Sequence, residues 1–164
     1  DYVDAIMKNY DSSSAKDVFT RSEANCIAKG IVDAVGVDKL KTVGTPDQVA
    51  SSSNPFQKVG KDLTKAQADE VVNVLTDGRC YDFTQLIVKQ ATKDSSGTFS
   101  KLSKKQVDCF FGQLLSKPAF KQAMADEILG RGSNSDAVSS ALSNQSDTFK
   151  ILSDCNISPS QLGG

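Results

Sequence analysis

Most of the reactive chemistry in this sequence lies in four cysteines, Cys26, Cys80, Cys109 and Cys155. The chain contains no histidine, which excludes histidine-based catalytic triads, the common zinc sites and the usual side-chain pH switch. No two cysteines have the close spacing of structural zinc sites or of Cys-x-x-Cys oxidoreductases. Disulfide formation is therefore the chemistry that these residues favour, and four unpaired thiols in a cytosolic protein are the alternative.

The cysteines occur in two sequence contexts that alternate along the chain. Cys26 and Cys109 each lie seven residues after an apolar residue that precedes a helix-start signal. Cys80 and Cys155 each come shortly after an apolar pair that is followed by Thr or Ser and then Asp. This order predicts two tandem half-repeats. We expect a single all-α domain with an N-terminal helix and linker over residues 1–18, half-repeat one over 19–100 and half-repeat two over 102–164.

The pairing of the cysteines follows from this pattern. Four cysteines allow three pairings, and the half-repeat symmetry favours Cys26–Cys80 and Cys109–Cys155. At about 100° per residue, Cys26 and Cys109 lie opposite the apolar stripes of their helices. A free structural cysteine is usually a small buried hydrophobe, so a disulfide to another segment suits these positions better. Because disulfides persist in oxidising compartments, we expect an exported protein, extracellular or at the cell surface.

Helix-start signals recur along the chain. In a capping box, a Ser or Thr side chain caps the helix and a Glu or Gln three residues later bonds back to it. The three matching pairs are Thr20 with Glu23, Thr64 with Gln67, and Ser103 with Gln106. A further helix near the N-terminus presents an apolar face of Val3, Ile6, Met7 and Tyr10. No run shows strand-like alternation between hairpin turns, so we predict an all-α helical bundle held by disulfides.

Composition and charge limit the classes of partner. The chain has 164 residues, with 19 Lys and Arg against 20 Asp and Glu, and a formal net charge of −1. This balance argues against a nucleic-acid-binding surface or a polybasic membrane patch. No stretch approaches the roughly 20 apolar residues of a membrane span. The chain begins at Asp1 rather than Met, which we interpret as a mature or trimmed product, and we expect membrane contact only through an anchor outside these residues.

Three segments carry a resemblance to a known group of proteins. They are Thr20-Arg21-Ser22-Glu23-Ala24-Asn25-Cys26, Ile31-Val32-Asp33-Ala34-Val35-Gly36-Val37-Asp38-Lys39-Leu40 and Leu102-Ser103-Lys104-Lys105-Gln106-Val107-Asp108-Cys109. The chain resembles repeats in secreted or membrane-anchored helical proteins of actinobacteria, over most of residues 19–155. The resemblance implies export and a helical repeat fold, and it supplies no catalytic residue.

Two functions remain in view. The first is a non-enzymatic, extracytoplasmic binding or structural module at the cell surface, with no metal or cofactor and with an unidentified protein or cell-envelope partner. The alternative is a carrier of an apolar small molecule or lipid in a cavity of the bundle. The residues expected to line that cavity are Ile27, Ile31, Val71, Leu75, Phe110, Phe111, Leu114, Phe120 and Met124. Phe110, Phe111, Phe120 and Met124 are the candidate ligand-binding residues among them. A hydrolase would need a Ser–Lys pair or paired carboxylates that converge from distant parts of the chain.

Overall fold

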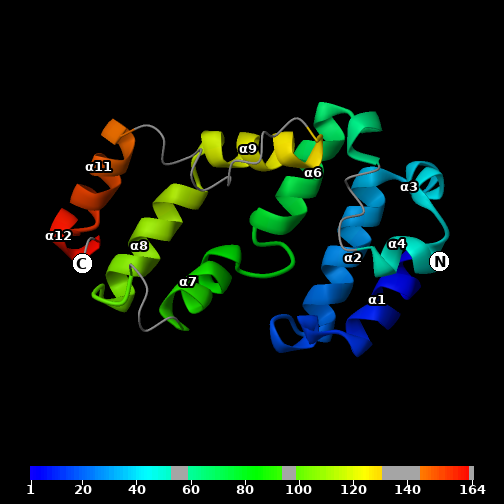
Figure 1. Cartoon of the computed structure of the whole chain (residues 1–164), viewed down its shortest axis with the longest axis horizontal. Helices are drawn as coiled ribbons and strands as arrows, with labels where there is room; N and C mark the ends of the chain where they lie inside the picture. Colours follow the sequence, from blue (N-terminus) through cyan, green and yellow to red (C-terminus); the bar gives the residue numbers. More distant parts are fainter. Residues whose placement is uncertain (53–58, 94–98, 131–144, 163–164) are drawn as a thin grey trace. The chain divides into compact units, whose positions relative to one another are not determined.

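The computed structural model describes residues 1–52, 59–93, 99–130 and 145–162 of the chain. Within these ranges the chain forms helices joined by turns and contains no strand (Figure 1), which confirms the all-α prediction. The helices, with the short 3-10 helices labelled η, are α1 (Tyr2–Ser12), η1 (Ser14–Asp17), α2 (Arg21–Val35), α3 (Val37–Val43), α4 (Pro46–Ser51), η2 (Gly60–Asp62), α6 (Lys65–Thr76), α7 (Phe83–Lys93), α8 (Lys104–Leu115), α9 (Pro118–Ile128), α11 (Gln145–Asp154) and α12 (Pro159–Leu162).

The chain divides into two compact units, which we describe separately. Unit 1 comprises Asp1–Tyr81 and Met124–Ser133, and unit 2 comprises Asp82–Ala123 and Asn134–Gly164. One of the points at which the chain passes from one unit to the other, between Ala123 and Met124, therefore falls inside α9. The bounds of these units differ from those of the expected half-repeats, which are 19–100 and 102–164. The arrangement of two half-repeats in a single domain stays a prediction.

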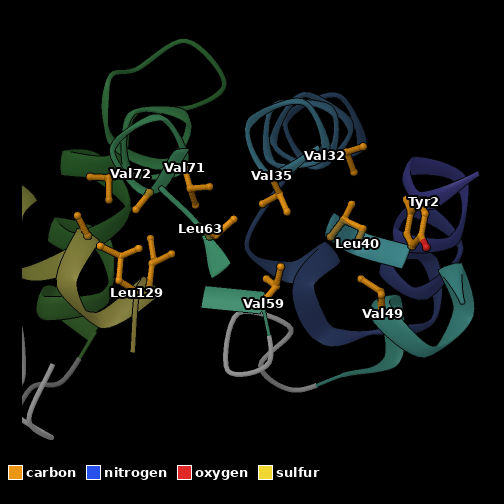
Figure 2. Packing of buried hydrophobic residues seen from close by; sticks show 13 residues of the cluster. Tyr2, Val32, Val35, Leu40, Val49, Val59, Leu63, Val71, Val72 and Leu129 are labelled. Atoms are coloured by element: carbon orange, nitrogen blue, oxygen red, sulfur yellow. The ribbon is translucent and has the colours of Figure 1, made fainter. Parts of the chain in front are cut away.

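Unit 1 is held together by an apolar core between its helices. Helix α1 packs against α2 and α4, and α2 also packs against α3 and α6. Figure 2 shows Tyr2, Leu40 and Val49 gathered at one end of this core, while Val71, Val72 and Leu129 lie at the other. Val35, Ala68, Val71 and Ala125 are completely buried. Each of these short helices is thus stabilised mainly by the face that it buries against its neighbours.

Unit 2 is organised around α8, which packs against α7 and α11. The buried face of α8 consists of Val107, Phe110, Phe111, Leu114 and Leu115. These positions follow the i, i+3, i+4, i+7 and i+8 spacing of an amphipathic helix. The apolar stripe expected after the Ser103 capping box is therefore the core of unit 2.

All three predicted capping boxes form. In α2, the Thr20 backbone N–H donates to the Glu23 carboxylate at 2.7 Å, and the Glu23 N–H donates to the Thr20 hydroxyl at 3.3 Å. The Thr64–Gln67 and Ser103–Gln106 boxes repeat this arrangement with Gln in place of Glu. The bonds from the Thr20 N–H and then the Thr20 hydroxyl lower the pKa of Glu23 below its ordinary value of 4.5.

The linker expected before residue 19 is mostly helical. Helix α1 extends to Ser12, and η1 covers Ser14–Asp17. The serines of this stretch support the turns instead of breaking them, since the Ser13 hydroxyl donates to the Tyr10 carbonyl and accepts the Ala15 N–H. The prediction of a helix followed by a linker was therefore wrong for the linker, because Ser side chains also cap helical turns.

Both predicted disulfides form, one in each unit. Cys26–Cys80 joins α2 to the segment after α6, with the Cα atoms 5.4 Å apart. Cys109–Cys155 joins α8 to the residue after α11, with the Cα atoms 5.6 Å apart. The Gln113 Nε2 lies 3.6 Å from both sulfurs of the second disulfide. All four cysteines are thus used in cross-links that tie distant helices within a unit.

We expect each disulfide to stabilise its unit by about 4 kcal/mol in the chain-entropy model, because the cross-links close loops of 54 and 46 residues. The double variants Cys26→Ala/Cys80→Ala and Cys109→Ala/Cys155→Ala isolate the two contributions. Denaturant unfolding under non-reducing conditions measures them. Thiol titration of the denatured, unreduced protein is the matching control, with no free thiol expected. A count of four thiols would contradict the pairing.

The capping box of α2 gives a second prediction, with a pH dependence. Thr20→Ala removes a cap and costs about 1 kcal/mol, whereas Thr20→Ser keeps the hydroxyl and serves as the control. Folding lowers the pKa of Glu23 below its ordinary value of 4.5. The contribution of the Glu23 carboxylate to the free energy of unfolding is therefore fully present above pH 4.5 and is lost as the pH falls through the lowered pKa. Glu23→Ala should therefore destabilise the protein at pH 7 and less in acid, as measured by denaturant unfolding at several pH values. An equal effect at every pH would contradict this.

Gly60 gives a third prediction, because it closely approaches the end of α9 within unit 1. A Cβ added at Gly60 would lie 2.0 Å from the Ile128 carbonyl oxygen, a backbone atom that cannot rotate away. We expect Gly60→Ala to destabilise the protein by about 3 kcal/mol, the upper part of the range for overpacking. The control is Gly112→Ala in α8, where nothing lies within 4 Å and where helix propensity favours Ala by roughly 0.5–1 kcal/mol. Thermal or denaturant unfolding of the two variants should shift in opposite directions.

Candidate functional site

Unit 1 contains two apolar pockets beside α1, α2 and α4, named lobe A and lobe B here, which share part of their lining. Lobe A has a volume of about 170 Å³ and is lined by Ile6, Ile31, Val32, Leu40, Val49, Ala50, Ser52 and Val59. Lobe B has a volume of about 210 Å³ and is lined by Ile6, Met7, Asn9, Tyr10, Ser13, Ala15, Phe19, Ala24, Ile27, Ala28 and Ile31. Ile6 and Ile31 line both lobes, so the junction between the lobes lies at these two side chains.

The residue sizes on α2 explain why lobe B exists. The face of α2 that lines it follows helical spacing through Ala24, Ile27, Ala28 and Ile31. The two alanines carry only a methyl group at positions where Leu or Ile would fill the space beside α1. Since protein interiors are otherwise closely packed, two small residues on one turn leave a hollow.

Lobe A is lined by α3 and α4 in addition to α1 and α2. Leu40 of α3 and Val49 of α4 lie close together at one end of the core (Figure 2), and both are almost fully buried. Val32 and Ile31 of α2 contribute the opposite wall. The two helices that supply these residues, α3 and α4, are short, with 7 and 6 residues.

The polar side chains at lobe B are already bonded within the protein. The Asn9 Nδ2 donates to the Ala50 carbonyl at 2.9 Å, and the Tyr10 hydroxyl donates to the Phe19 carbonyl at 2.7 Å. Ser13 donates to the Tyr10 carbonyl. Among the residues that the structure describes, none of those that line the two lobes carries a charge. Since burying an unpaired charge is costly, the pocket suits an uncharged, apolar molecule.

The predicted ligand-binding residues lie elsewhere. In unit 2, the Phe110 and Phe111 rings pack against each other at 5.3 Å and against Phe99 at 5.8 and 5.1 Å. Phe120 packs against Phe83 at 6.4 Å. Phe110, Phe111 and Phe120 are each at most 5% exposed, so these rings fill the core. Ligand binding by them stays a prediction that the pocket in unit 1 does not support.

Met124 and the remaining expected lining residues divide between pocket and core. Met124 packs, partly buried, against the core of unit 1. Ile27 and Ile31 line the pocket as expected, whereas Val71 is completely buried. Leu75 packs against the core of unit 1, and Leu114 is completely buried in unit 2. The expected set therefore does not form one cavity.

Sequence reasoning missed the contribution of α1. Ile6, Met7 and Tyr10 belong to the predicted apolar face of the N-terminal helix, but they were not among the residues expected to line a cavity. The available signal was the combination of that face with the small Ala24 and Ala28 on the helix that follows. Whether two helices leave a cavity between them depends on which of their side chains face each other, and this pairing cannot be read from the sequence of either helix alone.

Ionisable groups gather on the surface of the described chain. Arg79 pairs with Glu70 at 2.8 Å and with Asp77 at 2.6 Å, and all three side chains are substantially exposed. Burial raises the pKa of Tyr81 to about 12, and its ring packs edge-on against Phe19 at 5.0 Å.

Among the described residues, no cluster of three or more His, Cys, Asp or Glu could bind a metal ion. No helix in the described ranges has the length and hydropathy to cross a membrane.

The fold and the pocket define an all-α protein with one disulfide in each of two units and an apolar pocket in unit 1. No family model, curated protein or solved structure matches the chain. Its intramolecular disulfides are compatible with an oxidising, extracellular environment.

Proposed function

We propose that the protein is a non-enzymatic, extracytoplasmic binding module that carries an apolar small molecule in lobes A and B. The observation that carries this proposal is the pair of pockets that share Ile6 and Ile31, whose described lining is mainly apolar and carries no charge. This makes the carrier function, the alternative from the sequence, the better supported of the two.

The size of the lobes supports a ligand of carrier type. A cavity of about 150 Å³ lined by aliphatic and aromatic side chains stays dry and binds benzene, and each lobe is somewhat larger than that. Taken together, the lobes reach the lower part of the roughly 300–1,000 Å³ range of small-molecule sites. Transfer of hydrocarbon from water into such a site is favourable by about 0.8 kcal/mol per methylene.

The disulfides support an extracytoplasmic location for this function. Cytosolic thiols are kept reduced, and stable disulfides are typical of exported proteins. Both cross-links join helices within a unit, and Cys26 lies on α2, the helix that also supplies Ile27 and Ile31 to the pocket. A carrier outside the cell would gain from this arrangement because the disulfide in unit 1 holds the pocket wall in place.

The environment-sensitive fluorophore N-phenyl-1-naphthylamine tests this proposal. We expect a saturable rise in its fluorescence with a Kd of roughly 1–10 μM, which corresponds to about −7 to −8 kcal/mol. Ile31→Trp places a large side chain at the junction of both lobes and should weaken binding at least tenfold. Val18→Trp is the matched control, because Val18 is 40% exposed and lines neither lobe.

The folding of each variant is checked by far-UV circular dichroism and denaturant unfolding. Ala24→Leu, a smaller enlargement inside lobe B, replaces Ile31→Trp if the latter does not fold. Binding that is absent in the unsubstituted protein, or equal in the pocket variants and in Val18→Trp, would overturn the proposal. Native mass spectrometry of the exported protein gives an independent measurement, with a bound mass expected.

A further inference from the structure

The division of the pocket into two lobes restricts the shape of its ligand. Ile6 and Ile31 line both lobes, and both side chains are half-buried. Isoleucine is branched at Cβ and has few accessible rotamers, so we expect the two side chains to form a rigid constriction between the lobes. A fused ring system needs one wide cavity, whereas a chain with freely rotating single bonds can pass a constriction and fill both lobes.

The volumes set the length of that chain. Benzene places six carbons in a cavity of about 150 Å³, and the lobes measure about 170 and 210 Å³. By this comparison each lobe takes about six carbons or slightly more, and a chain that fills both has about twelve.

The polar groups set the orientation and charge of the ligand. The side chains of Asn9, Tyr10 and Ser13 lie at lobe B, whereas Ser52 supplies the single polar side chain among the described residues of lobe A. The Tyr10 and Ser13 hydroxyls donate one hydrogen bond each and the Asn9 Nδ2 donates another, and the oxygens of these side chains still have acceptor capacity. An uncharged polar end, such as a hydroxyl, therefore suits lobe B, and the described residues of the two linings offer a carboxylate no cationic partner.

We infer that the ligand is an uncharged, unbranched hydrocarbon chain of about twelve carbons, which crosses from lobe A to lobe B between Ile6 and Ile31 with its polar end at lobe B. This inference rests on the proposed function and adds the shape, length and charge of the ligand.

A series of 1-alkanols from 1-hexanol to 1-tetradecanol tests the inference by isothermal titration calorimetry. In the unsubstituted protein, we expect the affinity to rise about three- to fourfold with each added methylene and to level off near twelve carbons. Ala50→Leu enlarges a residue that lines lobe A alone, and Ala24→Leu enlarges a residue that lines lobe B alone. In both variants the affinity should stop rising at about half of this chain length, whereas Val18→Leu should bind the alkanols as the unsubstituted protein does.

Two further ligands sharpen the test. Dodecanoate should bind at least tenfold more weakly than 1-dodecanol, because the described lining residues offer its charge no partner. The cage-shaped 1-adamantanol should also bind more weakly than 1-dodecanol. An affinity that does not depend on chain length, a length limit unchanged in both lobe variants, or binding of 1-adamantanol equal to that of 1-dodecanol would each overturn the inference.

The outcomes separate the two proposals. If N-phenyl-1-naphthylamine binds at the pocket and the alkanols show no dependence on chain length, the inference about the ligand is wrong and the carrier function stands. If neither the fluorophore nor any alkanol binds, both are wrong.

Discussion

The structure depends on burying the apolar faces of helices that are too short to be stable alone. The longest described helix, α2, has 15 residues, and isolated helices of that length are marginal in water. Each unit therefore needs contacts between helices that lie far apart in the sequence, and a disulfide fixes one such contact in each. In unit 1 the cross-link runs from α2 to the residues after α6, and in unit 2 it runs from α8 to the residue after α11. The pocket is bounded by α2, so its shape depends on the same packing.

The parts of the fold that were predictable from the sequence are those with local causes. A capping box involves two residues three positions apart, so Thr20 with Glu23 and Ser103 with Gln106 could be identified without knowing the tertiary structure. The disulfide pairing was predictable for another reason, since the two sequence contexts of the cysteines matched in order. The short helix η1 could not be predicted from the sequence, because its Ser-rich segment is compatible both with a linker and with a capped turn.

The candidate site was predictable only in part. The helix faces were assigned correctly, and Ile27 and Ile31 do line a pocket. The aromatic residues Phe110, Phe111 and Phe120 attracted the ligand-binding prediction because they are large, but large side chains fill space and these pack against other rings. Space was left instead where α2 carries alanines opposite α1. A cavity arises where the side chains that face each other from different helices are too small to fill the space between them.

The order of the cysteines has a consequence for how the molecule is made. Cys80 and Cys109 are closer in sequence than the partners of either native disulfide, yet they belong to different units. Loop-closure entropy favours joining near neighbours in an unstructured chain, so an oxidant that acts before the helices associate would produce a link between the units that the native state lacks. By this term the loop between Cys80 and Cys109 closes only about twice as readily as either native loop. Thiol–disulfide exchange then converts such an early link into the native pairs once the helices associate.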